Sequence, residues 1–171
     1  MALGAAVPAT SAHPQFADSP PLLSLAFGAV QIFDNHQELF WGVEYRPAFQ
    51  IFHVGPWFLF GTGKNDEFYA AIGALMNVEL GRGWTFTPSF GAGYYNASSG
   101  LDLGFDAEFR SAVELTRCFG NGQRIGLCFA HLSNGSLSDK NPGTESIGLN
   151  YAFPLNRIFR CPPPDPPPPA K

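Results

Sequence analysis

Charge is scarce in this sequence. Only 14% of its 171 residues are Asp, Glu, Lys or Arg, whereas charged residues make up about 25% of an average globular domain. Ten Lys and Arg residues stand against fourteen Asp and Glu residues, which gives a formal net charge of -4. A surface that binds nucleic acid needs basic side chains against the phosphates. The composition therefore predicts no nucleic-acid partner.

Long hydrophobic runs are also absent. No stretch reaches the roughly 18 uncharged apolar residues of a membrane-spanning helix, which excludes that class of protein. Hydrophobic residues nevertheless make up 45% of the chain and aromatic residues 15%, including 17 Phe. A chain with this much apolar surface and little net charge is able to fold, so disorder is excluded for most of it. These features favour a β-rich protein.

Proline divides the sequence into three parts. Of the 16 Pro residues, four lie at positions 8–21 and seven at positions 162–169. Because proline locks φ and removes a backbone donor, we predict a proline-rich disordered tail at residues 161–171. Residues 1–20 are predicted to be the remnant of a signal peptide or an ordinary flexible leader. The folded domain is predicted at residues 21–160.

Segments with period-two alternation fill the middle of the chain, and turn residues separate them. Their connections are short enough for hairpins, so the predicted topology is an up-and-down antiparallel meander. Eight such strands favour closure into a barrel, which removes the sheet edges. The strands are predicted at residues 22–33, 37–46, 50–61, 66–80, 83–95, 105–118, 122–133 and 144–154.

The predicted strands carry large apolar residues on one face and polar or small residues on the other. In the sixth strand, Phe109, Val113 and Leu115 alternate with Glu108 and Glu114. A soluble barrel that keeps its apolar face inside needs a charged exterior, which this sequence lacks. The alternation therefore favours an all-β, eight-stranded, antiparallel up-and-down transmembrane β-barrel with its apolar face toward lipid.

This arrangement also predicts where polar and aromatic side chains lie. In the lumen, Glu108 and Glu114 are predicted to pair with Arg110. Aromatic residues near the strand ends are predicted to form girdles at the two membrane interfaces. The girdle candidates are Trp41, Trp57, Trp84, Tyr94, Tyr95, Tyr151 and Phe153.

Connection lengths predict the orientation of the barrel. Outer-membrane barrels alternate short periplasmic turns with longer external loops, and the connections of this sequence alternate in the same way. We therefore expect the seventh strand to end at the outer surface. The short connections are at 46–49, 81–83 and 119–122, and the longer ones are at 61–66, 96–104 and 134–143.

Three polar residues interrupt the lipid-facing side of the last predicted hairpin. His131 and Ser133 share the parity of Phe129, and Glu145 shares that of Ile147. A connection of about ten residues predicts that Glu145 lies opposite His131 or Ser133, and directly opposed residues of antiparallel strands lie about 5 Å apart, so all three side chains are able to touch. A nucleophile, a base and an orienting acid at this spacing are typical of a Ser-His-acid triad. The alternative is that all three are rim residues at headgroup level, where polar side chains cost little.

A short motif, HLSNG at residues 131–135, precedes Glu145 and resembles the active-site signature of the lipid A 3-O-deacylases, the PagL family of outer-membrane enzymes. The resemblance implies catalytic roles for His131, Ser133 and Glu145 and an oxyanion donor at Asn134. It also implies hydrolysis of the ester-linked 3-hydroxyacyl chain at position 3 of lipid A, in the outer leaflet of the cell outer membrane, with no metal or organic cofactor. The expected partners are then lipid A and outer-membrane lipid. The alternative function is a non-catalytic outer-membrane barrel with a structural or adhesion role.

The sequence contains three cysteines. Cys118 and Cys161 both fall at the predicted periplasmic end, an oxidising compartment compatible with a disulfide between them. Cys128 has the parity of the lumen and is interpreted as a small interior residue. No Cys or carboxylate cluster at ligand spacing accompanies the other three histidines, so no metal site is predicted.

Overall fold

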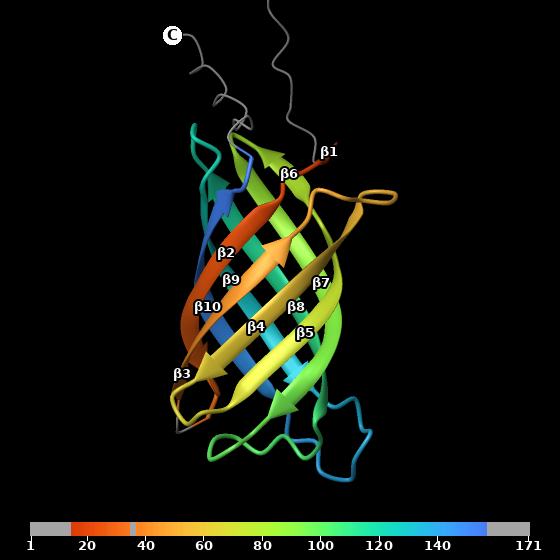
Figure 1. The fold of residues 1–171 in the computed structure, drawn as a ribbon, viewed down its shortest axis with the longest axis vertical. Coiled ribbons are helices and arrows are strands. Elements are labelled where there is room, and N and C mark those ends of the chain that lie inside the picture. Colours follow the sequence, from red (N-terminus) through yellow and green to blue (C-terminus); the bar gives the residue numbers. More distant parts are fainter. Residues whose placement is uncertain (1–14, 35–36, 157–171) are drawn as a thin grey trace, which may run out of the picture.

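The computed structural model describes residues 15–34 and 37–156 and shows a closed, twisted β-barrel (Figure 1). The strands are β1 Gln15–Phe16, β2 Leu22–Val30, β3 Glu38–Arg46, β4 Val54–Gly63, β5 Phe68–Met76, β6 Val78–Gly81, β7 Trp84–Asn96, β8 Ala107–Cys118, β9 Arg124–Ser133 and β10 Thr144–Pro154. All pairs are antiparallel, and the pairing of β7 with β8 closes the ring. Because β5 and β6 both pair with β7, they form one strand of the wall. The predicted eight-stranded meander is therefore confirmed.

A proline accounts for the break between β5 and β6. The register places Leu75 opposite Ser89 and Val78 opposite Phe86, so Pro88 faces the break. Proline has no backbone N–H and interrupts the ladder of hydrogen bonds. Beside it, the Thr87 hydroxyl donates to Asn77 Oδ1 at 2.9 Å and ties the two strands together.

A short strand lies before the predicted domain boundary at residue 21. Gln15 and Phe16 form β1, which pairs with the outer side of β6, and Ala17 N–H donates to Asn77 O at 3.0 Å. Residues 1–14 of the predicted leader and the proline-rich tail at residues 161–171 lie outside the described residues. Cys118 is disulfide-bonded, but its predicted partner Cys161 also lies outside them, so that pairing stays a prediction.

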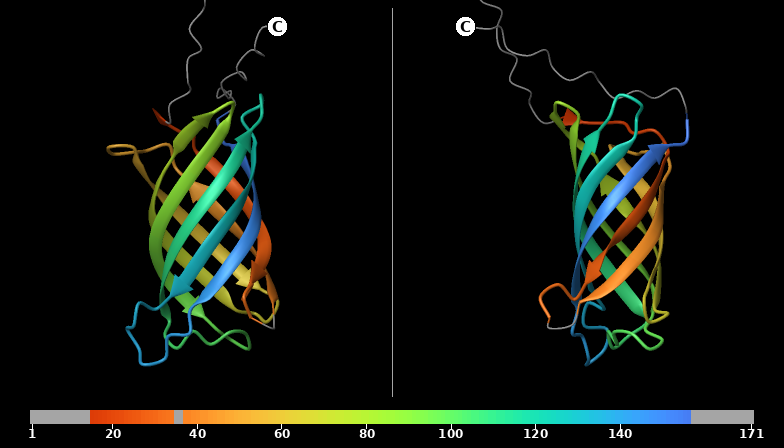
Figure 2. Two further views of the ribbon diagram at one scale, coloured as in Figure 1. Left: turned by 180° about the vertical axis from the view of Figure 1, so that it is seen from behind. Right: turned by 90° about the vertical axis from the view of Figure 1, so that its left-hand side faces the viewer.

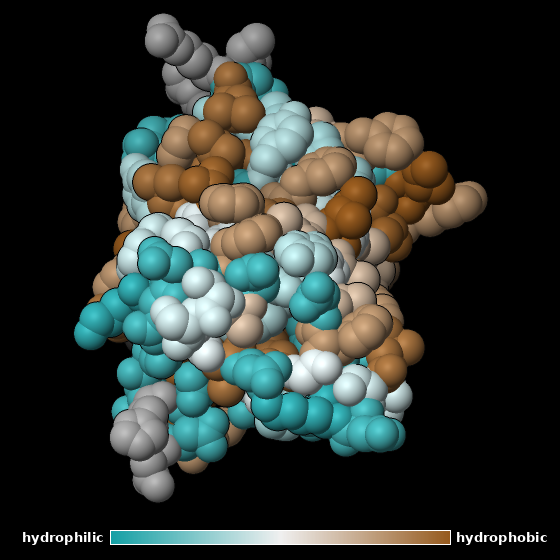
Figure 3. Space-filling view, turned by 60° about the horizontal axis from the view of Figure 1, so that its bottom comes forward, coloured by the Kyte–Doolittle hydropathy of each residue, from teal (hydrophilic) through white to brown (hydrophobic). Residues whose placement is uncertain are grey.

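The outside of the barrel is apolar. Along each wall strand the exposed side chains are large and hydrophobic, as the alternation predicted; they include Leu25, Phe27, Trp41, Val43, Phe58, Phe60, Ile72, Phe90, Val113, Leu115, Leu127, Ile147 and Leu149. Hydrophilic residues gather over one end of the barrel, and hydrophobic ones cover the adjoining wall (Figure 3). Among the described residues, no helix is long and apolar enough to cross a bilayer.

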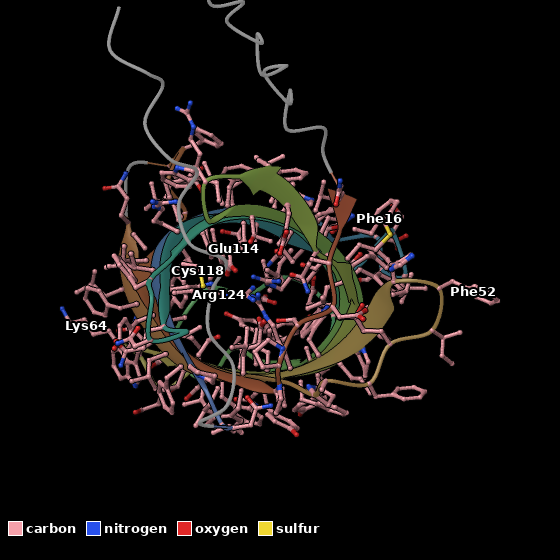
Figure 4. All side chains as sticks on the ribbon, turned by 90° about the horizontal axis from the view of Figure 1, so that it is seen from above. Phe16, Phe52, Lys64, Glu114, Cys118 and Arg124 are labelled. Carbon is pink, nitrogen blue, oxygen red and sulfur yellow. The ribbon has the colours of Figure 1, made fainter. Side chains whose placement is uncertain are left out.

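The lumen contains a buried network of charged groups. Arg46 donates to both carboxylate oxygens of Glu114 at 2.9 Å, and its Nε donates to Glu44 at 2.5 Å. Asn150 donates a further hydrogen bond to Glu114. Glu114 and Arg124 lie inside the ring of strands when the barrel is seen along its axis (Figure 4). The network fills this part of the lumen with side chains.

The predicted pairing of Arg110 with Glu108 and Glu114 was wrong. Arg110 donates instead to Cys128 Sγ at 3.3 Å, and its guanidinium lies 5.5 Å from the ring centroid of Trp57. Neither carboxylate oxygen of Glu108 has a hydrogen-bond partner among the described residues. Glu114 pairs across the lumen with β3 because Arg46 brings a charge of opposite sign to the same level.

Two girdle candidates were also wrong, since Trp57 and Tyr95 are buried. Trp57 points into the lumen and donates from Nε1 to Ala74 O at 3.2 Å. Glycines make room for its ring: a Cβ at Gly73 or at Gly91 would lie 2.5 Å from Trp57 Cζ2. Tyr95 faces inward because its neighbour Tyr94 takes the outward position, as successive residues of a strand must alternate.

Candidate active site

The two ends of the barrel differ. The connections at 97–106 and 134–143 lie together at one end, here called the loop end, in all three views of the ribbon (Figures 1 and 2). The two ends of the described chain lie at the opposite, terminal end. β9 finishes and β10 begins at the loop end. The three predicted catalytic residues therefore lie at the loop end of one hairpin.

His131 and Glu145 form a hydrogen-bonded pair on the outside of the wall. The register sets them directly opposite each other, and Nδ1 of His131 lies 3.0 Å from Oε1 of Glu145. Their side chains are 44% and 31% exposed, and the exposed Phe129 and Ile147 follow them along the same face. The pair is thus accessible from the side on which lipid surrounds the barrel.

Ser133 lies two residues beyond His131 on the same face of β9, at a spacing of about 7 Å along the strand. Within the described residues the structure records no hydrogen bond between its hydroxyl and the imidazole. Catalytic hydrogen bonds are often loose without substrate and tighten in the complex. The lack of this hydrogen bond is therefore compatible with a triad.

Gly143 borders the imidazole from the loop side. A Cβ at this position would lie 3.1 Å from Cε1 of His131 and 3.7 Å from Nε2, and φ is +63°. A positive φ favours glycine, and any other residue is strained there. Gly143 therefore keeps space open beside the nitrogen that a triad uses as its base, and the sequence analysis did not identify it.

A second serine lies beside the pair. Ser111 of β8 is directly opposite His131, on the side away from Glu145. It has the lipid-facing parity of its strand, so the sequence contained a signal for it. The connection between β8 and β9 is only residues 119–123, so hairpin pairing limited the β8 partner of His131 to a few positions, and this signal was overlooked. Two hydroxyls, Ser111 and Ser133, are thus near the same imidazole.

Asn134, the predicted oxyanion donor, is fully buried. Its Nδ2 donates to Leu103 O at 3.0 Å and to Lys140 O at 2.8 Å, while its Oδ1 accepts from the N–H of Ser136 at 3.0 Å. Both amide hydrogens are engaged, so the side chain has none left for an oxyanion. The structure gives Asn134 a different place, as the point at which the two long connections are joined.

Asn141 is the amide with a free donor near Ser133. Its Oδ1 accepts from the backbone N–H of Asn134 at 3.1 Å, which fixes the side chain next to the residue that follows the serine. Its Nδ2 has no hydrogen-bond partner among the described residues. Asn141 lies in an exposed loop without periodicity, so only the folded structure brings it to the site.

An ion pair also links the two long connections. Lys140 Nζ lies 2.5 Å from Asp102 Oδ2, and the backbone N–H of Gly104 donates to Oδ1 of the same carboxylate at 2.8 Å. The hydrogen bond from Lys140 and the one from Gly104 lower the pKa of Asp102. Both partners of the ion pair are exposed, so water weakens the attraction.

A cavity of about 100 Å³ lies inside the barrel near the loop end, lined mainly by apolar side chains. Its lining includes Leu132, Thr144 and Ser146, which alternate along β9 and β10 with His131 and Glu145. The wall therefore separates this cavity from the imidazole. No group of three or more metal-ligating side chains occurs in residues 15–34 and 37–156.

The fold and the site together define a membrane barrel that carries a His–Glu pair beside a serine on its outer face. A model of the lipid A 3-O-deacylase (PagL) family matches residues 23–154. The chain belongs to this family, whose members are ester hydrolases. The alternative of a non-catalytic barrel is thereby disfavoured.

Two solved structures are similar to this chain. The outer-membrane enzyme PagL has 17% sequence identity and a TM-score of 0.64, with 78% of this chain and 99% of that chain covered. The Yersinia pestis outer-membrane protein Ail has 16% identity and a TM-score of 0.48, with the same coverage. The likeness to PagL shows the fold of an outer-membrane β-barrel. No curated protein matches the sequence.

Proposed function

We propose that the chain removes the ester-linked 3-hydroxyacyl chain from position 3 of lipid A with the triad Ser133, His131 and Glu145. One observation carries the proposal: the hydrogen-bonded His131–Glu145 pair lies on the outer face, with Ser133 on the same strand, in a chain of the lipid A 3-O-deacylase family. Each of the three side chains has a distinct chemical task in this reaction.

In the proposed first half of the reaction, His131 Nε2 takes the proton of Ser133 Oγ while that oxygen attacks the ester carbonyl. Glu145 accepts the hydrogen bond of Nδ1–H, which keeps Nε2 as the base and stabilises the imidazolium. The bond between the acyl carbon and the sugar oxygen then breaks, and that oxygen receives the proton from His131. Water attacks the acyl-Ser133 ester in the second half and releases the 3-hydroxy fatty acid.

The negative charge that develops on the carbonyl oxygen needs a donor. We assign this role to Nδ2 of Asn141 in place of Asn134, because the Asn134 amide is already engaged. A donor placed before the reaction stabilises the oxyanion without reorganisation, and losing one such donor typically costs a factor of about 10² to 10³ in kcat.

The proposed orientation places the loop end at the outer surface of the cell. The longer connections lie at this end, and outer-membrane barrels carry their longer loops outside. The outward-facing site then lies in the outer leaflet, at the level of the ester groups of lipid A. Its substrate reaches it without leaving the membrane.

Mass spectrometry of lipid A tests the proposal, with the native protein, Ser133→Ala and Ser111→Ala expressed in cells whose lipid A is fully acylated. We expect the native protein and Ser111→Ala to remove one 3-hydroxyacyl group, and Ser133→Ala to be at least about 10³-fold slower. Ser111 is a matched control because it is directly opposite His131 on the same face. Loss of activity in Ser111→Ala alone would assign the nucleophile to β8 and overturn the proposed triad.

A further inference from the structure

The connection between β3 and β4, residues 47–53, projects from the terminal end of the barrel. Seen along the axis, it extends outward beyond the ring of strands, with Phe52 at its tip (Figure 4). It is called the projecting turn below. The sequence predicted a strand from residue 50, but β4 begins only at Val54.

The projecting turn is apolar and exposed. Phe49, Ile51 and Phe52 are 64%, 56% and 93% exposed, and no Asp, Glu, Lys or Arg occurs between Arg46 and Lys64. The other connections at this end carry polar residues: the one between β6 and β7 contains Arg82, and the one between β8 and β9 contains Asn121 and Gln123. Three large apolar side chains in one short turn are unfavourable in water.

The turn is also held in a defined shape. Ile51 and Val54 exchange two backbone hydrogen bonds of 2.9 and 3.0 Å around Phe52 and His53. The φ angles of these two residues are +50° and +66°, as in a type I′ turn, where Asn-Gly is the usual pair. Bulky residues there are strained. The ring of His53 stacks on that of Phe16 in β1, with 5.2 Å between the ring centroids, and this contact holds the turn against β1.

β1 explains why the turn points outward. In the wall, β4 pairs with β5 only as far as Val54 and Met76. Beyond that point β1 occupies the free side of β6, through Gln15 and Phe16. The chain before Val54 therefore has no place in the wall and lies outside it.

We propose that the projecting turn inserts into the lipid leaflet at the terminal end, with Phe49, Ile51 and Phe52 at the boundary between headgroups and acyl chains. The turn is continuous with the lipid-facing wall, because the exposed Val54 and Phe58 follow it on β4. Its outward direction keeps it in the plane of the membrane around the barrel and away from the mouth of the lumen.

The size of the turn favours lipid over a second copy of the chain. A large aromatic side chain buries about 150–250 Å² when it is inserted into a partner. The three apolar side chains of the turn together could therefore bury roughly 500 Å². A stable protein interface buries about 800 Å² on each partner. Lipid, in contrast, already surrounds the adjoining wall.

An anchor at the terminal end also fixes the height of the other end. The barrel is one closed sheet, so the depth of the projecting turn sets the level of His131 in the opposite leaflet. This consequence rests on the orientation given under the proposed function, whereas lipid insertion of the turn does not.

Photo-cross-linking tests the insertion. The full chain carries p-benzoylphenylalanine in place of Phe52 and is folded into phosphatidylethanolamine and phosphatidylglycerol vesicles. Matched versions carry the same group in place of Leu149 of the wall or Asn121 of the other turn. We expect a phospholipid adduct at position 52 with a yield within about twofold of position 149, and none at position 121.

Each other outcome overturns the proposal. A covalent dimer at position 52 makes a second copy the occupant, and no adduct at position 52 alongside a normal adduct at position 149 places the turn in water. Position 49 supplies a second label on the same turn if the first variant folds poorly. The cross-linking experiment does not depend on activity toward lipid A, so its outcome is independent of the proposed enzymatic function.

Discussion

The clearest test of the loop end concerns Asn134→Ala. The side chain makes three hydrogen bonds, to Leu103 O, to Lys140 O and from the N–H of Ser136. Each typically contributes about 1 kcal/mol, so their loss amounts to about 3 kcal/mol. Since every 1.4 kcal/mol is a factor of ten in an equilibrium constant, local opening of the loop should become about a hundredfold more frequent.

Amide hydrogen exchange measures this opening in the folded barrel. We expect exchange at Ser136 and Leu137 to accelerate by about two orders of magnitude in Asn134→Ala, because Leu137 N–H donates to Asn134 O within the same loop. Exchange in the middle of β9 should stay unchanged. Deacylation should fall as well, because the loop that holds Asn141 against the backbone N–H of residue 134 opens more often.

Asn141→Asp is the complementary variant. The substitution keeps an oxygen that accepts from Asn134 N–H but removes the Nδ2 donor, so exchange should resemble the native protein while kcat falls by about 10² or more. Native exchange together with lost activity in Asn134→Ala would refute the reasoning. That result would return the oxyanion role to Asn134, as the sequence motif predicted.

Three further predictions concern the barrel and its loops. Gly91→Ala should destabilise the barrel by about 1–3 kcal/mol, because the new Cβ lies 2.5 Å from both Trp57 Cζ2 and Ile72 O. Urea unfolding followed by tryptophan fluorescence measures this loss. Gly120→Ala is the control and should have the native midpoint, because a Cβ at Gly120 would meet no atom within 4 Å. Glu114→Gln should lower the free energy of unfolding by about 3 kcal/mol in the same assay. This is the low end for a broken buried ion pair, because Glu44 still faces Arg46. An equal loss of stability in Asp139→Asn, at an exposed position, would contradict this reason. Because the pKa of Asp102 is lowered, its ion pair with Lys140 is present above the ordinary Asp pKa of about 3.9 and is lost as the pH falls through the lowered pKa of Asp102. NMR relaxation at Gly104 should show a change at this acidic pH in the native protein and no change in Asp102→Asn.

The pairing of His131 with Glu145 was predictable because strand parity and hairpin pairing are local properties. Opposed residues of a hairpin share a face, so a connection of about ten residues limits the partners of Glu145 to a few positions. The alignment of Ser111 with His131 follows from the same local rule, because β8 and β9 form a hairpin whose connection is only residues 119–123. The sequence-based prediction applied the rule to β9 and β10 and not to β8.

Contacts across the lumen and between loops could not be predicted from the sequence, because they join residues that lie far apart in the chain. Arg46 and Glu114 are 68 residues apart, and alternation shows only that both point inward. The burial of Asn134 requires Leu103 from a different connection, in a loop without periodicity. Trp57 was named as a girdle residue although it alternates with the exposed Phe58 and shares the inward parity of Gly55, so the strand pattern itself contained the signal for its burial.

The position of the His131–Glu145 pair on the outside of the wall has a kinetic consequence. A hydrolase with such a site meets its substrate by lateral diffusion in two dimensions, so its rate follows the mole fraction of substrate in the leaflet. Adding more vesicles of unchanged composition should leave the turnover number unaltered, whereas diluting the substrate with inert phospholipid at constant total lipid should lower it. Under the proposed function, the apparent Michaelis constant of this barrel is a surface fraction and not a bulk concentration.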